Sequence, residues 1–274
     1  MSQQIIIFIY YLILPFIFLS YYSTSKAQNL HFIVFADVTD PYIGQGNIRS
    51  LELLDGLMQK IENYEIFSDI KIHKFTNQKF TNQEFDSLIN NLSTSKVSQV
   101  HKNDIVFFYY LGHGQNKALK VWPNLLFEEA NTKQEVTKVN LEDINLKLTS
   151  LKAQLTLTFA ETCNVISKYD QNDAYVVATM PPSYKLRKKQ LENLFLHTKG
   201  NIILVSTDLD QYSYTNSKSG GLFTQTLIKE LKKYEYSENE LKWEYLLNKI
   251  QISVERFAKN NKLEQIPYYE IVQK

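Results

Sequence analysis

The two residues of this sequence best suited to covalent chemistry are His113 and Cys163, and each follows a run of apolar residues. Cys163 is the only cysteine in the 274 residues, and His113 stands between Gly112 and Gly114. An imidazole beside a thiol can take the thiol proton and hold the sulfur as a nucleophilic thiolate. The two residues therefore predict nucleophilic catalysis, provided that the fold brings them together.

The apolar runs that precede these residues predict two buried strands. Residues 105–111 read IVFFYYL, with no polar alternation, and residues 155–159 read LTLTF. Such runs are typical of strands covered on both faces in a parallel sheet, and ligands of such sheets bind at the carboxyl ends of the strands. Structural roles are the alternative for a lone histidine and a lone cysteine. The strand-end positions and the flanking glycines favour chemistry for His113 and Cys163.

Strands and amphipathic helices alternate along the rest of the chain. Strand-like segments lie at 31–38, 69–75, 105–111, 155–159, 201–206 and 266–272. Apolar residues recur at helical spacing in 51–61, 82–92, 141–151, 223–231 and 243–257. This alternation predicts one α/β domain with three layers and a mostly parallel central sheet. Gly44 and Gly46 indicate a loop before the first helix, Asn82 is the expected cap of the second, and Pro267 indicates that the last strand is at an edge.

The first 27 residues differ in composition from the rest of the chain. Residues 5–19 read IIIFIYYLILPFIFL, which has the length of a signal-peptide core rather than of a membrane span. Small residues before Gln28 predict cleavage there, and an uncleaved membrane anchor is the alternative. We therefore expect residues 1–27 to be a signal peptide or anchor and residues 28–274 to be one exported domain, either secreted or periplasmic. A lone cysteine in an exported protein suggests a reactive thiol or intermolecular pairing.

Charge and residue spacing exclude some classes of function. The chain has 30 basic and 29 acidic residues, a formal net charge of +1, and this balance gives no support for nucleic-acid binding. A single cysteine and dispersed histidines lack the ligand spacing of a zinc site, so no metal site is expected.

Four segments, in order, resemble the caspase-type (clan CD) cysteine peptidases, and most of all their metacaspase-like and bacterial branch. They are FYYLGHG at 108–114, ETCN at 161–164, GGLFTQTLI at 220–228 and QIPYYEI at 265–271. The histidine precedes the cysteine by about 50 residues, as in caspases. The resemblance covers residues 31–272 and implies the α/β/α sandwich of that family.

The resemblance implies roles for particular residues. His113 becomes the general base or imidazolium partner and Cys163 the nucleophile, while the backbone N–H groups of Gly114 and Cys163 form the oxyanion hole. Glu161 would line the pocket for the side chain before the cut and favour Arg or Lys. Arg49 lies near the place where caspases have a pocket arginine, and its pairing with Glu161 would instead favour Asn or another residue.

The sequence also departs from the family pattern. Leu111 replaces a small serine and is expected to narrow the pocket. The basic run at 185–189 is expected either to be a self-processing site or to be a solvated loop. No cofactor is expected, although the resemblance allows calcium; the acidic residues that could bind it, or simply form a solvated surface, are Glu128, Glu129, Glu142, Asp143 and Asp170.

The resulting hypothesis is an exported cysteine endopeptidase that acts through an acyl-enzyme and cleaves after a basic residue. Its partners would be protein or peptide substrates, with no nucleic acid, and with membrane contact only if the N-terminal segment is retained. The oligomeric state does not follow from the sequence. One alternative is a catalytically silent caspase-fold binding or signalling module. Another is a different Cys–His acyl transferase, which a pocket lined by neither Glu161 nor Arg49 would indicate.

Overall fold

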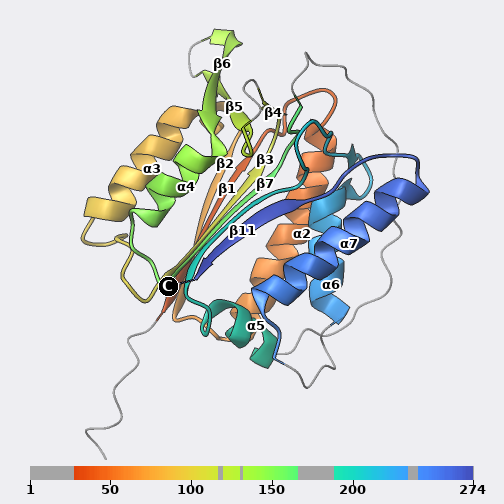
Figure 1. Cartoon of the computed structure of the whole chain (residues 1–274). Coiled ribbons are helices and arrows are strands. Elements are labelled where there is room, and N and C mark those ends of the chain that lie inside the picture. Colours follow the sequence, from red (N-terminus) through yellow and green to blue (C-terminus); the bar gives the residue numbers. More distant parts are fainter. Residues whose placement is uncertain (1–27, 117–119, 130–131, 166–187, 234–239, 274) are drawn as a thin grey trace, which may run out of the picture.

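A six-stranded, mostly parallel sheet forms the centre of the molecule (Figure 1). The structure is a computed structural model, and it describes residues 28–116, 120–129, 132–165, 188–233 and 240–273. The strand order is β11-β8-β7-β3-β1-β2, in which β11 alone runs antiparallel to its neighbour. The central strands are β1 (Asn29–Ala36), β2 (Asp69–Thr76), β3 (Ile105–Leu111), β7 (Leu155–Glu161), β8 (Gly200–Val205) and β11 (Tyr268–Gln273).

Helices cover both faces of this sheet, which makes the expected three layers. The helices are α2 (Gly44–Asn63), η1 (Asn77–Lys79), α3 (Asn82–Thr94), α4 (Leu141–Thr149), α5 (Lys188–Phe195), α6 (Leu222–Lys233) and α7 (Trp243–Asn260). Figure 1 shows α3 and α4 on one face and α2, α6 and α7 on the other. The three-layer α/β sandwich predicted from the alternation of elements is confirmed.

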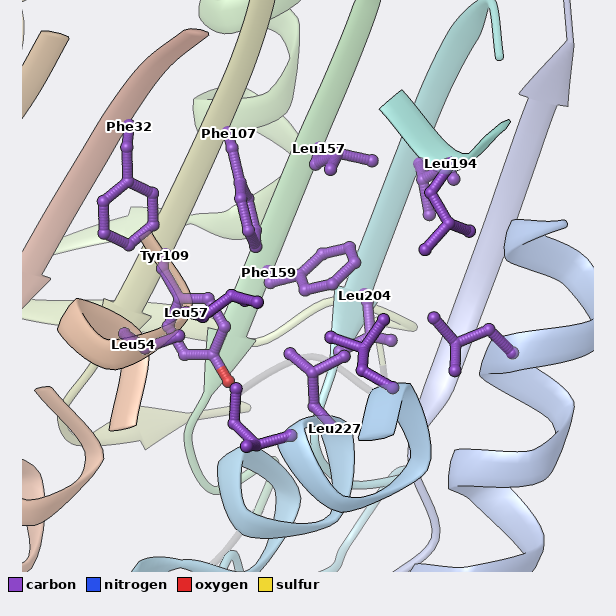
Figure 2. Close-up of a cluster of buried hydrophobic side chains, with 14 of the residues drawn as sticks. Phe32, Leu54, Leu57, Phe107, Tyr109, Leu157, Phe159, Leu194, Leu204 and Leu227 are labelled. Atoms are coloured by element: carbon purple, nitrogen blue, oxygen red, sulfur yellow. The ribbon is translucent and has the colours of Figure 1, made fainter. Parts of the chain in front are cut away.

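The two faces of each central strand bury different apolar clusters. On β3, Phe107 and Tyr109 pack with side chains of α2, α6 and α7, while Phe108 and Tyr110 pack with side chains of α3 and α4. Figure 2 shows the first cluster, where Phe107 and Phe159 lie between the sheet and the helices. Burying one such aromatic side chain stabilises the fold by roughly 2–3 kcal/mol, and both faces of β3 gain this stabilisation.

The start of α2 differs from the expectation for Gly44 and Gly46. Both glycines lie inside the first turns of the helix instead of in a preceding loop. A Cβ at Gly44 would come within 2.6 Å of the Val38 carbonyl oxygen, and a Cβ at Gly46 would overlap the side chain of Thr215. These glycines therefore permit close packing of the helix and do not break it.

Two smaller differences concern the region of α3 and the segment after β3. Thr81 caps α3 in place of Asn82, because its hydroxyl accepts a hydrogen bond from the backbone of Glu84 at 3.2 Å. The sequence ALKVW followed by Pro123 indicates a short excursion or hairpin after β3, and the excursion in the structure is larger. It forms a three-stranded side sheet of β4 (Gly114–Gln115), β5 (Asn124–Glu129) and β6 (Thr132–Asn140). A two-stranded ribbon, β9 (Thr215–Asn216) and β10 (Gly220–Gly221), precedes α6.

Some expectations fall outside the described residues. Residues 1–27 are among these, so the signal peptide or anchor and the boundary at residue 28 stay predictions. Within the part of the chain that the structure describes, no helix has both the length and the apolar character needed to cross a membrane.

Candidate active site

The strands that precede His113 and Cys163 are neighbours in the sheet and end at the same level. β3 and β7 pair in parallel, and their register aligns Leu111 with Glu161, the last residue of each strand. His113 and Cys163 each follow two residues later in the chain. The sheet therefore delivers both residues to one edge, as the sequence predicted.

Gly114 brings the chain after His113 into contact with the chain at Cys163. A Cβ built at Gly114 would overlap the carbonyl oxygen of Cys163 and the hydroxyl of Thr162. Only a glycine fits between these groups. The position that the resemblance assigns to the oxyanion hole thus lies directly beside the backbone of the proposed nucleophile.

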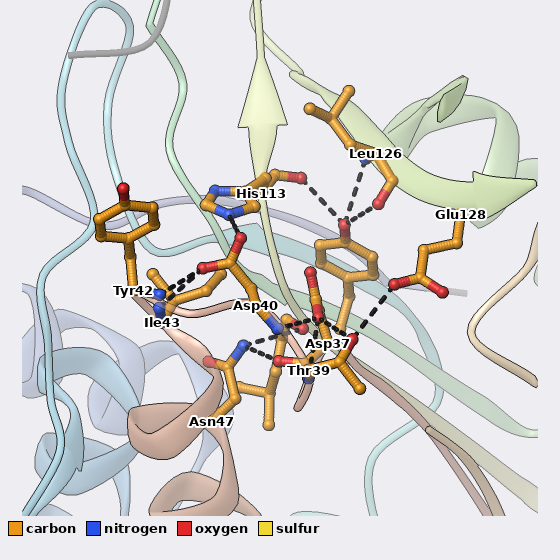
Figure 3. Close-up of polar contacts among 11 residues, drawn as sticks. Asp37, Thr39, Asp40, Tyr42, Ile43, Asn47, His113, Leu126 and Glu128 are labelled. Atoms are coloured by element: carbon orange, nitrogen blue, oxygen red, sulfur yellow. Dashed lines mark hydrogen bonds and ion pairs between the residues drawn. The ribbon is translucent and has the colours of Figure 1, made fainter. Parts of the chain in front are cut away.

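His113 is held through both its main chain and its ring. The hydroxyl of Tyr110 donates to the His113 carbonyl oxygen, with the two oxygens 2.9 Å apart. On the ring, Nε2 lies 3.0 Å from Oδ2 of Asp40, and the two side chains are only 18% and 16% exposed. Figure 3 shows the Asp40 carboxylate between the His113 ring and the loop that leads to α2.

Asp40 is a residue of the site that sequence reasoning missed. It follows β1 in the segment Thr39–Asp40–Pro41, where an Asp before a proline indicates only a turn. Its Oδ1 accepts backbone hydrogen bonds from Tyr42 at 2.8 Å and Ile43 at 3.0 Å. The signal that could have found it is its place at the carboxyl end of β1, the strand beside β3.

The Asp40 carboxyl is held in its ionised form. Burial raises its pKa, but the hydrogen bonds from His113, Ile43 and Tyr42 lower the pKa by more, so that the net shift is below the usual value. A carboxylate that stays ionised only accepts hydrogen bonds.

Cys163 is half-buried and contacts the loop before α6. Its sulfur accepts a hydrogen bond from the backbone N–H of Ser213 at 3.4 Å. Burial raises the pKa of the thiol above its usual value, and the Ser213 N–H opposes that rise. Burial therefore favours the protonated sulfur, which needs a base to become a nucleophile.

Buried asparagines join the loops that follow the two residues. Asn116 lies three positions after His113, and its Nδ2 donates to Oδ1 of Asn164, the residue after Cys163, at 2.8 Å. The backbone N–H of Asn116 also donates to the carbonyl oxygen of Val165 at 2.7 Å. These bonds tie the two loops together next to the site.

Glu161 is in the site region, but its carboxylate faces α6. It is 6% exposed, and its Oε1 accepts hydrogen bonds from the backbone of Phe223 at 2.9 Å and of Thr224 at 3.3 Å. The Thr224 hydroxyl donates to Oε2. Burial raises the pKa of the Glu161 carboxyl to about 7, although these hydrogen bonds lower it.

The remaining residues proposed for the pocket have other partners. The guanidinium of Arg49 pairs with Glu52, one turn along α2, at 2.7 Å rather than with Glu161. Leu111 is fully buried in the apolar cluster on the α2, α6 and α7 face, so its side chain is part of the core.

No cofactor site is assigned in the described part of the chain. Ligand atoms of Asp37, Asp40 and His113 lie within 4.8 Å of one another. However, both oxygens of Asp40 are already engaged, and Oδ1 of Asp37 accepts hydrogen bonds from Thr39 and from the Asp40 backbone. These hydrogen bonds explain why the side chains of Asp37, Asp40 and His113 lie close together. Among the acidic residues named for calcium, Asp170 lies outside the described residues, as does most of the basic run at 185–189.

Comparisons with known proteins find a matching family model and a similar solved structure. The sequence model of the caspase domain, a peptidase family, matches residues 51–273. The crystal structure of caspase-1 from Spodoptera frugiperda is similar to this structure with a TM-score of 0.53. That match has 16% sequence identity and covers 89% of this chain and 85% of the caspase chain. A comparison with curated protein sequences finds no match.

Proposed function

The chain belongs to the caspase domain family of cysteine peptidases, and from this premise we propose that it is an exported endopeptidase with a Cys163–His113 dyad. The observation that carries the proposal is the contact of Gly114 with Cys163, which joins the two strand ends. Family membership makes a protein or peptide the substrate.

The reaction that these residues support proceeds through an acyl-enzyme. The thiol proton of Cys163 passes to the His113 ring, and the thiolate attacks the carbonyl carbon of the peptide bond. The N–H groups of Gly114 and Cys163 donate hydrogen bonds to the oxyanion that forms. His113 then gives the proton to the leaving amine, and water releases the acyl group from the sulfur. No cofactor takes part in these steps.

Cleavage after a basic residue is a separate part of the proposal. Glu161 is the carboxyl nearest to Cys163 in the sequence, and above about pH 7, where it is ionised, its burial keeps the negative charge poorly screened. Its carboxylate oxygens already accept hydrogen bonds from α6, whereas the side chain of Arg49 is 43% exposed. A substrate with Asp or Asn before the cut is the competing outcome, in which Arg49 has the leading role.

The test is hydrolysis of fluorogenic peptides that differ only in the residue before the cut. The chain recovered after export from an expression host is assayed with and without calcium, beside Cys163→Ala. We expect turnover of Arg and Lys peptides that Cys163→Ala abolishes. The mass of the recovered chain also tests the N-terminal proposal, since cleavage before Gln28 removes the first 27 residues.

A catalytically silent binding or signalling module is the second candidate. The observation in its favour is the burial of the Cys163 thiol, which raises its pKa above the usual value and so favours the protonated sulfur. No turnover under any condition, together with no alkylation of Cys163 in the folded protein, would establish this alternative.

A further inference from the structure

Asp40 and His113 lie on different strand ends, yet they form a direct, nearly buried contact. Asp40 follows β1 and His113 follows β3, and these strands are adjacent and parallel. Oδ2 of Asp40 lies 3.0 Å from Nε2 of His113. Figure 3 shows that the carboxylate approaches the ring from the side of the loop before α2.

We propose that Asp40 is the positioning residue for His113, which holds the ring in the tautomer protonated at Nε2. This inference rests on the proposed function of the Cys163–His113 dyad. It adds Asp40 to the Cys163–His113 dyad as a third residue. Asp40 lies outside the four segments that carry the resemblance to caspase-type peptidases.

The tautomer follows from the chemistry of the contact. An ionised carboxylate only accepts hydrogen bonds, so the proton between the two atoms belongs to Nε2. In the neutral ring, Nδ1 then carries the lone pair. When the S–H bond of Cys163 breaks, the proton forms a bond to Nδ1 and the charge stays on the sulfur. The imidazolium that results is stabilised by the negative charge of Asp40.

The carboxylate is itself fixed, which a positioning role requires. Its Oδ1 accepts hydrogen bonds from the backbone of Tyr42 and Ile43, at the start of α2. On the other side, the hydroxyl of Tyr110 holds the His113 carbonyl oxygen. The ring is therefore oriented from both its backbone and its Nε2 edge, so little rotational freedom has to be lost in the transition state.

Other charged groups of this region are engaged elsewhere. A carboxylate oxygen of Asp37 lies within 4.8 Å of ligand atoms of Asp40 and His113. However, Oδ1 of Asp37 accepts hydrogen bonds from Thr39 and from the Asp40 backbone. Glu128 of β5 accepts a hydrogen bond from the Thr39 hydroxyl at 3.2 Å. Asp40 directly contacts the His113 ring.

The substitution Asp40→Asn separates positioning from support of the loop. Asn keeps Oδ1 for Tyr42 and Ile43, but it places an NH₂ donor opposite Nε2. That donor favours the tautomer protonated at Nδ1, which cannot take the thiol proton. Thr39→Val is the matched control, because it removes two hydrogen bonds of the same loop without contacting His113.

Steady-state kinetics of the full chain across pH tests the proposal. We expect Asp40→Asn to lower kcat on the order of 10²-fold with little change in KM, and to move the acid limb of kcat/KM to lower pH, since His113 acts as the neutral base and its imidazolium loses its counter-charge. Thr39→Val should keep about half or more of the wild-type kcat. Equal kcat and pH profiles for Asp40→Asn and wild type would overturn the proposal, as would equal losses in both variants with an unchanged profile.

A second measurement keeps this inference separate from the proposed function. If the wild-type chain hydrolyses no peptide, the proposed function fails, and the rate of Cys163 alkylation by iodoacetamide then decides the role of Asp40. Slower alkylation of Asp40→Asn than of wild type and Thr39→Val near about pH 6 supports the proposal. Identical alkylation rates for all three overturn it.

Discussion

Asn116 and Asn164 form a buried side-chain hydrogen bond of 2.8 Å that joins the loop after His113 to the loop after Cys163. Asn164 also donates to the Val121 carbonyl oxygen at 3.2 Å. Cys163 is the second residue after β7, and its thiol can react efficiently only if its loop keeps one conformation. This amide pair restricts both loops at once, so the geometry of the site depends on a contact that takes no part in the reaction.

Replacing Asn164 by Ala should therefore weaken both the fold and the site. The change removes the Asn164 partner of the buried Asn116 side chain and of the part-buried Val121 carbonyl oxygen, and a buried polar group left unsatisfied costs about 1–3 kcal/mol. We expect the free energy of unfolding to fall by about 2–4 kcal/mol, with a loss of peptidase activity. Urea unfolding measures the first effect. The control Asn91→Ala, at an exposed position of α3, should stay within about 0.5 kcal/mol of wild type.

Gly114→Ala should disrupt the site because a Cβ there overlaps the Cys163 carbonyl oxygen. We expect a loss of kcat of about 10-fold or more, since small displacements of reacting groups are costly. Gly56→Ala is a matched control, because no atom lies within 4 Å of its Cβ position in α2. That control should raise the free energy of unfolding by about 0.5–1 kcal/mol and leave kcat unchanged. Wild-type kcat in Gly114→Ala would show that the close approach is not needed.

Glu161 should make stability fall as the pH rises through the weakly acidic range. Burial raises the pKa of its carboxyl from 4.5 to about 7, so the folded chain keeps a proton that the unfolded chain releases. This contribution is complete below about pH 4.5 and is lost as the pH approaches 7. Relative to Glu161→Gln, wild type should lose about 2–3 kcal/mol of unfolding free energy over that range. Parallel pH dependence in the two proteins would contradict the prediction.

His73 should act in the opposite direction, as a source of acid sensitivity. Burial, together with the smaller effects of the nearby His31 and Lys71, lowers its pKa from 6.5 to about 4. The unfolded chain therefore binds a proton more readily, and stability present above about pH 6.5 is lost as the pH falls toward 4. His73→Gln should flatten this decline in urea midpoints measured across pH. The decline should persist in His101→Gln, whose side chain is 65% exposed.

The central strands were predictable because a strand that is buried on both faces consists almost entirely of apolar residues. The run 105–111 is apolar at every position, and each of its residues is buried in β3. The edge position of β11 followed from Pro267, which cannot donate to a neighbouring strand. The start of α2 was not predictable from Gly44 and Gly46, because their role is contact with Val38 and Thr215, residues distant in the chain or outside the helix.

The site was predictable only where its residues carry local signals. His113 and Cys163 combine a reactive side chain with a strand end, so their common location followed from sheet topology. Asp40 and Asn164 carry no such signal, since an aspartate before a proline and an asparagine in a loop are common turn residues. The orientation of Glu161 toward α6 depends on packing between β7 and α6, which the sequence pattern does not encode.

The most direct test of the account is covalent labelling of the nucleophile. The full chain is incubated with peptidyl acyloxymethyl ketones that end in Arg or in Asp, and intact mass and peptide mapping locate the adduct. We predict one adduct per chain on Cys163, formed faster with the Arg compound, slowed in His113→Ala and absent in Cys163→Ala. An adduct on another residue, or an active protein that Cys163→Ala leaves active, would contradict the assignment of Cys163 as the nucleophile.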